Sequence, residues 1–143
     1  MKLKKGIDYE RLTYWSHWAL RKRGYKYRLL RKQRIVTDIQ PEERLVGSNH
    51  WVTLNKNGSM VLLPSYCCDG PSGPTWDTAT TIRAAFFHDA FYQLIREGKL
   101  FMDIRLRADD VLYRLMREDG AWVWRARVWV WAVKNFAQRA AVA

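Results

Sequence analysis

Apolar side chains recur at helical spacing near the start of the chain. Tyr9, Leu12 and Ala19 fall on one side of a helix drawn over residues 8–22. Gly24 follows this pattern, and glycine commonly ends a helix because it tolerates a left-handed backbone conformation. We therefore expect an N-terminal helix.

Beyond Gly24 the pattern changes to the alternation that is typical of β-strands. Aromatic and β-branched residues alternate with polar ones up to about residue 63. Two such runs flank Asn57 and Gly58, and the Asn-Gly pair supplies the positive φ angles that tight hairpin turns require. We expect a small antiparallel sheet over residues 25–65.

Three longer patterns predict helices in the C-terminal half of the chain. They cover residues 79–96, 106–118 and 122–136. The third pattern also fits a strand, but its length favours a helix. The connection between the first two helices is short, which predicts that they pack as an antiparallel pair.

Together these elements predict an α+β fold in one domain, residues 1–143. The chain is 48% hydrophobic and 14% aromatic, which is enough apolar surface to exclude a disordered protein. The expected parts are a basic N-terminal helix (1–24), a small antiparallel β-sheet (25–65), a loop rich in glycine and proline (66–78), and a three-helix part (79–139).

The positive charge of the chain is concentrated at its N-terminal end. Residues 1–34 hold 12 of the 25 Lys and Arg but two of the 14 Asp and Glu, so they carry +10 of the net charge of +11. Such a segment attracts anionic partners, and both a phospholipid surface and nucleic acid fit this description. Residues 12–20 add aromatic side chains beside these cations, a composition found in helices that lie on membranes. The alternative is a helix that packs on the domain through its aromatics.

Cysteine content and hydropathy bear on the compartment. Cys67 and Cys68 are the only cysteines and are adjacent, so no disulfide framework is expected. The basic start is followed by acidic residues instead of an apolar run, so we expect no signal peptide. No apolar stretch approaches the ~20 residues of a transmembrane segment. We expect a reducing, cytoplasmic setting.

One histidine has acidic neighbours at a spacing that suggests chemistry. On a helix, His88 and Asp89 point about 100° apart, whereas Tyr92 lies one turn from His88 on the same face. A carboxylate on the next helix, Asp109 or Asp110, would orient the imidazole and leave its other nitrogen as a general base. The alternative is a buried histidine that is paired for structural reasons.

Oxygen ligands suitable for a metal ion lie just before this helix. Asp69 and Asp89, with the backbone carbonyls of the loop from Gly70 to Gly73, offer the hard donors that Ca²⁺ prefers. The alternative is a turn that leads into the helix, with Asp69 bonded to its own backbone.

Several of these motifs together resemble a family common in phage and prophage genomes. The motifs are Tyr66-Cys-Cys-Asp-Gly-Pro-Ser-Gly-Pro, the His-Asp-Ala-Phe-Tyr run that begins at His88, and the Arg-Ala-Asp-Asp run that begins at Arg107. The family is catalogued as domain of unknown function 1353, and the likeness covers roughly residues 25–136. It implies a phage protein, placed in the host cytoplasm or in the virion, without indicating an activity.

The same region is more distantly similar to phospholipase A2. Those enzymes place a glycine-rich calcium loop before a helix with His-Asp-x-x-Tyr, and a further Asp on the antiparallel helix that follows. The resemblance implies that His88 is the water-activating base, Asp109 its orienting partner and Tyr92 the tyrosine of the motif. It also implies that Asp89 holds Ca²⁺, with Gly70 and Gly73 in the calcium loop.

Three functions follow from these observations. The first is calcium-dependent hydrolysis of an ester, a phospholipid, at an anionic lipid surface. The second is a non-catalytic structural or accessory protein that binds other phage proteins, in which His88 and Asp109 lock two helices together. The third is nucleic-acid binding through residues 1–34.

Overall fold

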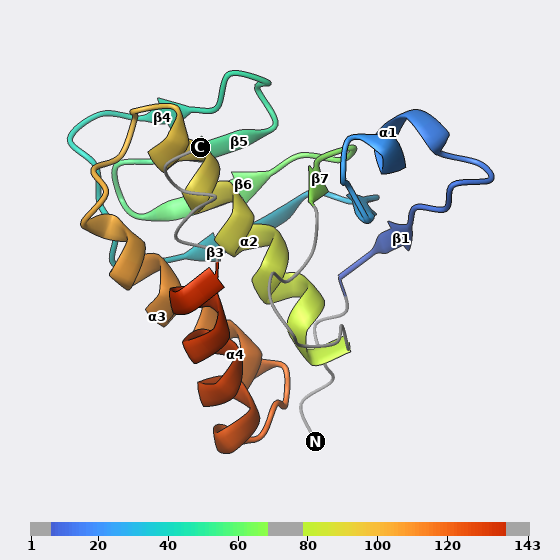
Figure 1. Cartoon of the computed structure of the whole chain (residues 1–143). Helices are drawn as coiled ribbons and strands as arrows, with labels where there is room; N and C mark the ends of the chain where they lie inside the picture. The colour runs from blue at the N-terminus through green and yellow to red at the C-terminus, as the bar shows by residue number, and fades with distance from the viewer. Residues whose placement is uncertain (1–6, 69–78, 137–143) are drawn as a thin grey trace.

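The structure is a computed structural model that describes residues 7–68 and 79–136. Its described parts form an α+β fold in which helix α2 lies between the strands and the other two long helices (Figure 1). The strands are β1 (Tyr9–Arg11), β2 (Tyr27–Leu29), β3 (Gln33–Val36), β4 (Leu45–Val46), β5 (Val52–Leu54), β6 (Ser59–Leu62) and β7 (Cys67–Cys68). The helices are α1 (Trp18–Lys22), α2 (Ala79–Arg96), α3 (Ile104–Glu118) and α4 (Val123–Phe136).

The antiparallel strands are divided between two sheets instead of forming one. A four-stranded sheet has the order β3-β6-β5-β4, and a three-stranded sheet has the order β1-β2-β7. The smaller sheet draws on segments outside the expected 25–65, because β1 pairs Tyr9 with Leu29 and β7 pairs Cys68 with Tyr27. The start of the expected loop 66–78 is therefore a strand, and the rest of that loop lies outside the described residues.

The prediction of a basic helix over residues 8–22 is wrong for most of that span. Residues Tyr9–Arg11 form a strand, and only Trp18–Lys22 are helical. The strand is more stable than a helix here because pairing with β2 packs Tyr9 edge-on against Tyr27 and brings Glu10 into an ion pair with Arg28. Leu12 is buried directly after the strand, which fixes its end on the fold. These long-range contacts outweigh the local helical spacing.

The predicted hairpin is present between β5 and β6, and Gly58 explains its turn. Asn55 pairs with Ser59 across a short loop, and Gly58 adopts φ +88°. Two features exclude a side chain at Gly58. One is this positive φ, and the other is that a Cβ there would lie 2.0 Å from the carbonyl oxygen of Thr37. That carbonyl approaches because the backbone and hydroxyl of Thr37 both donate hydrogen bonds to the carbonyl of Gly58.

Helix α2 is the central element because nearly all of its sides are apolar. Every residue from 81 to 95 is buried except the half-buried Asp89, and such a helix must be covered on several faces. Helix α3 runs antiparallel to it, as predicted. Arg83 near the start of α2 pairs with Asp119 just after α3, while His88 pairs with Asp109.

Helix α4 resolves the ambiguous third pattern in favour of a helix. It buries Ala126, Trp129 and Ala132, whose spacing of three residues defines one helical face. That face packs against α3. Among the helices of the described residues, none combines the length and apolar character needed to cross a membrane.

Candidate functional site

Three of the predicted site residues meet between the two antiparallel helices. His88 and Tyr92 lie one turn apart on α2, and their rings are 4.2 Å apart between centroids. Both face Asp109 on α3. The Nε2 of His88 lies 2.6 Å from Oδ1 of Asp109, and the hydroxyl of Tyr92 donates a hydrogen bond of 2.9 Å to the same oxygen.

Asp109 was one of two adjacent carboxylates proposed to orient the histidine, and the structure distinguishes them. Asp109 is fully buried, whereas Asp110 is exposed. The helical rotation of about 100° between neighbours turns one side chain into the helix pair and the other into solvent. The sequence left this choice open because the register of α3 against α2 depends on packing.

The hydrogen bond to Asp109 determines which nitrogen of His88 is available for chemistry. A carboxylate oxygen accepts, so the proton of the neutral imidazole resides on Nε2 and the lone pair on Nδ1. Nδ1 makes no hydrogen bond with any residue that the structure describes. A buried carboxylate that fixes one imidazole tautomer is the arrangement of a general base with its orienting partner.

Tyr92 supports Asp109 through a hydrogen bond, and its phenol does not release its proton as an acid. Burial raises the pKa of Tyr92 well above its usual value, and the negative charge of Asp109 and the hydrogen bond to it add to this effect. The phenol therefore stays protonated and donates to the carboxylate. Tyr92 and His88 together hold Oδ1 of Asp109 in place.

Arg105 is a cation beside this site that none of the sequence motifs indicated. Arg105 is half-buried on α3 one turn before Asp109, and its charge favours the ionised form of Tyr92. Two buried polar atoms here, Nη1 of Arg105 and Oδ2 of Asp109, have no hydrogen-bond partner among the described residues. The spacing of four residues between the two was the available signal.

Asp89, the proposed calcium ligand, is half-buried on α2. Its charge raises the pKa of Tyr66, after the larger effect of burial on that phenol, and it also adds to the raised pKa of Tyr92. Tyr66 directly precedes β7, and Asp69, Gly70 and Gly73 follow that strand in the sequence. Those three residues lie outside the described residues. Within residues 7–68 and 79–136, no three His, Cys, Asp or Glu side chains are grouped to hold a metal.

Comparisons with protein-family models, with curated proteins and with solved structures find no match to this chain. The residues of the site come from two helices that pack along their length, so the relative position of His88 and Asp109 is set by the core and not by a loop.

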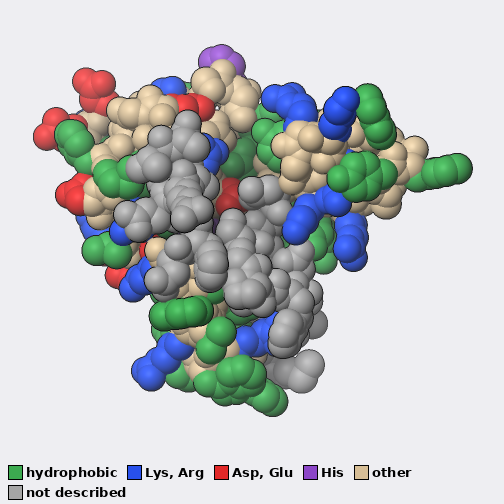
Figure 2. All heavy atoms as spheres, in the orientation of Figure 1, with side chains coloured by type: hydrophobic (Ala, Val, Ile, Leu, Met, Phe, Trp, Pro, Cys, Tyr) green, Lys and Arg blue, Asp and Glu red, His purple; other side chains and the backbone are tan. Residues whose placement is uncertain are grey.

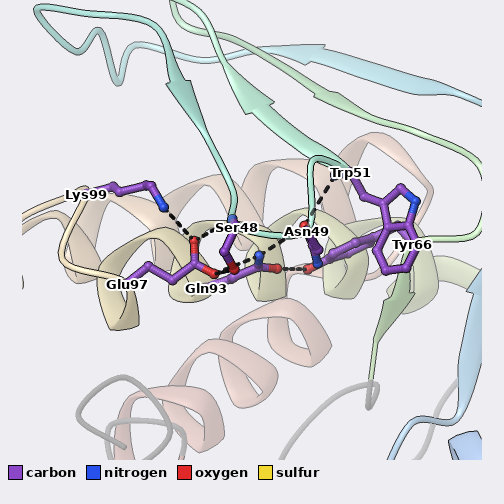
Figure 3. Close-up of polar contacts among 7 residues, drawn as sticks. All are labelled: Ser48, Asn49, Trp51, Tyr66, Gln93, Glu97 and Lys99. Carbon is purple, nitrogen blue, oxygen red and sulfur yellow. Dashed lines mark hydrogen bonds and ion pairs between the residues drawn. The ribbon is translucent and has the colours of Figure 1, made fainter.

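A second polar cluster joins α2 to the loop between β4 and β5 (Figure 3). The backbone and hydroxyl of Ser48 donate hydrogen bonds of 3.0 and 2.6 Å to the carboxylate of Glu97. Gln93 donates to Asn49 and to Glu97, and accepts a long hydrogen bond of 3.4 Å from the hydroxyl of Tyr66. These contacts fix the loop on α2 next to Tyr66.

This second cluster lowers the pKa of its carboxylate. Burial alone would raise the pKa of Glu97, but hydrogen bonds from Ser48, Lys99 and Gln93 lower it to about 2. These hydrogen bonds anchor the loop between β4 and β5 to the C-terminal end of α2.

Proposed function

We propose that this protein hydrolyses an ester with His88 as general base, and that its substrate is a phospholipid. The observation that supports this proposal is the position of Asp109, fully buried and 2.6 Å from Nε2 of His88. A histidine oriented in this way presents Nδ1 as the basic nitrogen. The choice of a phospholipid rests on the resemblance to phospholipase A2, and a phage setting rests on the resemblance of residues 25–136 to the phage family.

The residues of this chain account for each proton transfer in such a reaction. Nδ1 of His88 takes a proton from a water molecule while the water oxygen bonds to the ester carbonyl carbon. Asp109 then stabilises the imidazolium, and Tyr92 keeps the accepting oxygen in place. When the tetrahedral intermediate collapses, the bond to the alcohol oxygen breaks and His88 returns its proton to that oxygen. General-base assistance of this kind contributes about 10² to 10⁴ in rate.

Calcium is part of the proposal through Asp89, which follows His88 on α2. Asp89 would hold Ca²⁺ together with Asp69, Gly70 and Gly73 of the preceding loop. The ion would polarise the ester carbonyl and stabilise the negative charge that forms on its oxygen. The assignment is supported by the charge of Asp89, which adds to the raised pKa of Tyr66, a residue shortly before this loop in the sequence.

The burial of the pair favours one competing function, a non-catalytic phage protein. The side chain of His88 is 6% exposed and that of Asp109 is 0% exposed, as expected for a polar lock between two helices. Under this alternative the protein would act by binding other phage proteins. The two functions differ in whether the loss of His88 abolishes a reaction or only stability.

An assay of phospholipid hydrolysis distinguishes them. Purified full-length protein is added to vesicles of phosphatidylglycerol in the presence of Ca²⁺ or a chelator, and release of fatty acid is measured. We expect wild-type activity that needs Ca²⁺, a loss of at least about 100-fold in His88→Gln, and a loss in Asp109→Asn. His50→Gln, a change at an exposed histidine in the loop between β4 and β5, should retain full activity.

Two results would contradict the proposal. One is the absence of hydrolysis by the wild-type protein on anionic and zwitterionic phospholipids and on simple esters. The other is equal turnover by folded His88→Gln, with folding checked by circular dichroism. Activity that survives the chelator would leave the role of His88 intact and would remove calcium from the account.

A further inference from the structure

The segment from β1 through α1 forms an arm with an unusually exposed apolar surface. Helix α1 has no buried residue, and two of its residues, Leu20 and Arg21, are half-buried. The arm is attached to the fold by the β1–β2 pairing and by Leu12, which is 2% exposed. A helix of five residues is unstable by itself in water, so this attachment is what presents the helix.

Large aromatic side chains cover this arm. Trp15 is 99% exposed, Trp18 is 60% exposed and Tyr14 is 58% exposed. Cations accompany them, since Arg21 lies over the ring of Tyr14 and Lys22 over the ring of Trp18, each 4.7 Å from the ring centre. Hydrophobic side chains (green) alternate with Lys and Arg (blue) on the part of the molecule that projects to the right in Figure 2.

The charge around the arm lacks internal compensation. The two acidic residues of this segment form ion pairs with nearby arginines, Glu10 with Arg28 and Asp8 with Arg31. Seven other cations of residues 11–34 form no ion pair with any carboxylate in the described part of the chain, namely Arg11, Arg21, Lys22, Arg23, Lys26, Lys32 and Arg34. Cations without a partner carboxylate attract anionic surfaces.

We propose that the arm formed by β1 and α1 is a docking surface for an anionic phospholipid bilayer. Tryptophan and tyrosine prefer the boundary between headgroups and acyl chains, where the ring is apolar and its polar atom stays hydrated. Lysine and arginine next to them pair with the anionic headgroups. The arm supplies both features on one projection, with Trp15 at full exposure.

The shape of the arm favours a bilayer over nucleic acid. Proteins that bind single strands stack the bases on aromatics inside a charged groove. The arm is convex, and two of its aromatic rings already carry a cation over one face. A convex surface with protruding indoles can enter the headgroup layer of a bilayer, but it gives a nucleic-acid strand no groove to follow.

This inference does not depend on hydrolysis at His88. Docking uses β1 and α1, whereas the proposed reaction uses α2 and α3. An experiment can therefore contradict docking without contradicting hydrolysis, and the reverse. A His88→Gln protein should bind vesicles as well as the wild type.

The test is a vesicle-binding measurement on the full chain. Sedimentation with phosphatidylglycerol vesicles, in a calcium-free buffer, gives the partition coefficient, and phosphatidylcholine vesicles give the neutral reference. We expect Trp15→Ala with Trp18→Ala to weaken binding about tenfold or more, and Arg21→Gln with Lys22→Gln to weaken it about tenfold. Binding of the wild type should fall as salt is raised. Since the altered side chains are exposed or form no core contact, melting temperatures should stay unchanged.

Helix α4 provides a matched control. Trp124 and Trp131 are 59% and 60% exposed, which matches Trp18. Their double change to alanine removes the same kind of side chain but leaves the arm intact, so binding should stay within about twofold of wild type. An equal loss in this control would overturn the proposal, as would equal binding to neutral vesicles. Retardation of an oligonucleotide without binding to anionic vesicles would also overturn it.

Discussion

The hydrogen bond between Tyr92 and Asp109 can be tested by removing one oxygen atom. Tyr92→Phe keeps the ring against His88, 4.2 Å between centroids, and deletes the donor that lies 2.9 Å from Oδ1. The carboxylate stays fully buried. The change therefore isolates the stabilisation that the hydroxyl gives to a buried charge.

The structure sets the expected size of this effect. A hydrogen bond to a charged group contributes about 1.5–3 kcal/mol. The upper half of this range applies, because Asp109 is fully buried and its Oδ2 has no hydrogen-bond partner among the described residues, so the carboxylate depends on the bonds to Oδ1. We expect the free energy of unfolding to fall by about 2–3 kcal/mol, which corresponds to a melting temperature lower by about 6–10 °C at this chain length.

Tyr66→Phe is the matched control for this experiment. Tyr66 is as buried as Tyr92, but its hydroxyl makes a long hydrogen bond of 3.4 Å to an uncharged amide oxygen of Gln93. We expect a loss of about 1 kcal/mol or less from this control. Both proteins lose the same atom from a buried ring, so the difference between them measures the contribution of the charge.

Urea unfolding followed by tryptophan fluorescence gives both values. A double-mutant cycle with Asp109→Asn then tests whether the effect of Tyr92 passes through the carboxylate, with a coupling energy of about 1 kcal/mol or more. If Tyr92→Phe is no more destabilising than Tyr66→Phe, or if the cycle shows no coupling, the hydroxyl does not support Asp109 and the reasoning is refuted.

Two further experiments test the surrounding fold, one at Gly58 and one at Glu97. Gly58→Ala should cost at least about 2 kcal/mol in unfolding free energy, because φ is +88° and the added Cβ would meet the Thr37 carbonyl at 2.0 Å. Gly24 also has a positive φ, +94°, but a Cβ there would have no atom within 4 Å. If Gly24→Ala lost as much unfolding free energy as Gly58→Ala, the steric explanation would be contradicted. The pKa of Glu97 is lowered to about 2, so its stabilisation is complete above about pH 4.5 and is lost as the pH falls toward 2. The stability difference between wild type and Glu97→Gln should shrink between pH 5 and pH 2, and a constant difference would show that Glu97 is not protonated over that range.

The helices could be predicted from the sequence because their signals are local. Each of α2, α3 and α4 has an apolar pattern of one period over fourteen residues or more. Strand β1 could not be predicted in this way. Its three residues form a strand because β2, some eighteen positions later, pairs with them, and nothing in their own pattern encodes that partner. The same reason explains why the strands divide into two sheets.

The candidate site shows the same division between local and long-range information. His88 and Tyr92 share a helical face, so their proximity could be predicted from a spacing of four residues. The choice of Asp109 over Asp110 and the position of Arg105 depend on how α3 is rotated against α2. That rotation is set by the packing of their apolar faces, which no short motif records.

Hydrolysis by wild-type protein and by His88→Gln, measured side by side on phosphatidylglycerol vesicles, tests the central claim most directly. Glutamine can still hydrogen-bond Asp109 but has no basic nitrogen, so it preserves the helix contact and removes the base. We expect fatty-acid release by the wild type and a rate at least about 100-fold lower for His88→Gln, at equal concentrations of folded protein. Equal rates in the two proteins would contradict the claim that His88 is the general base.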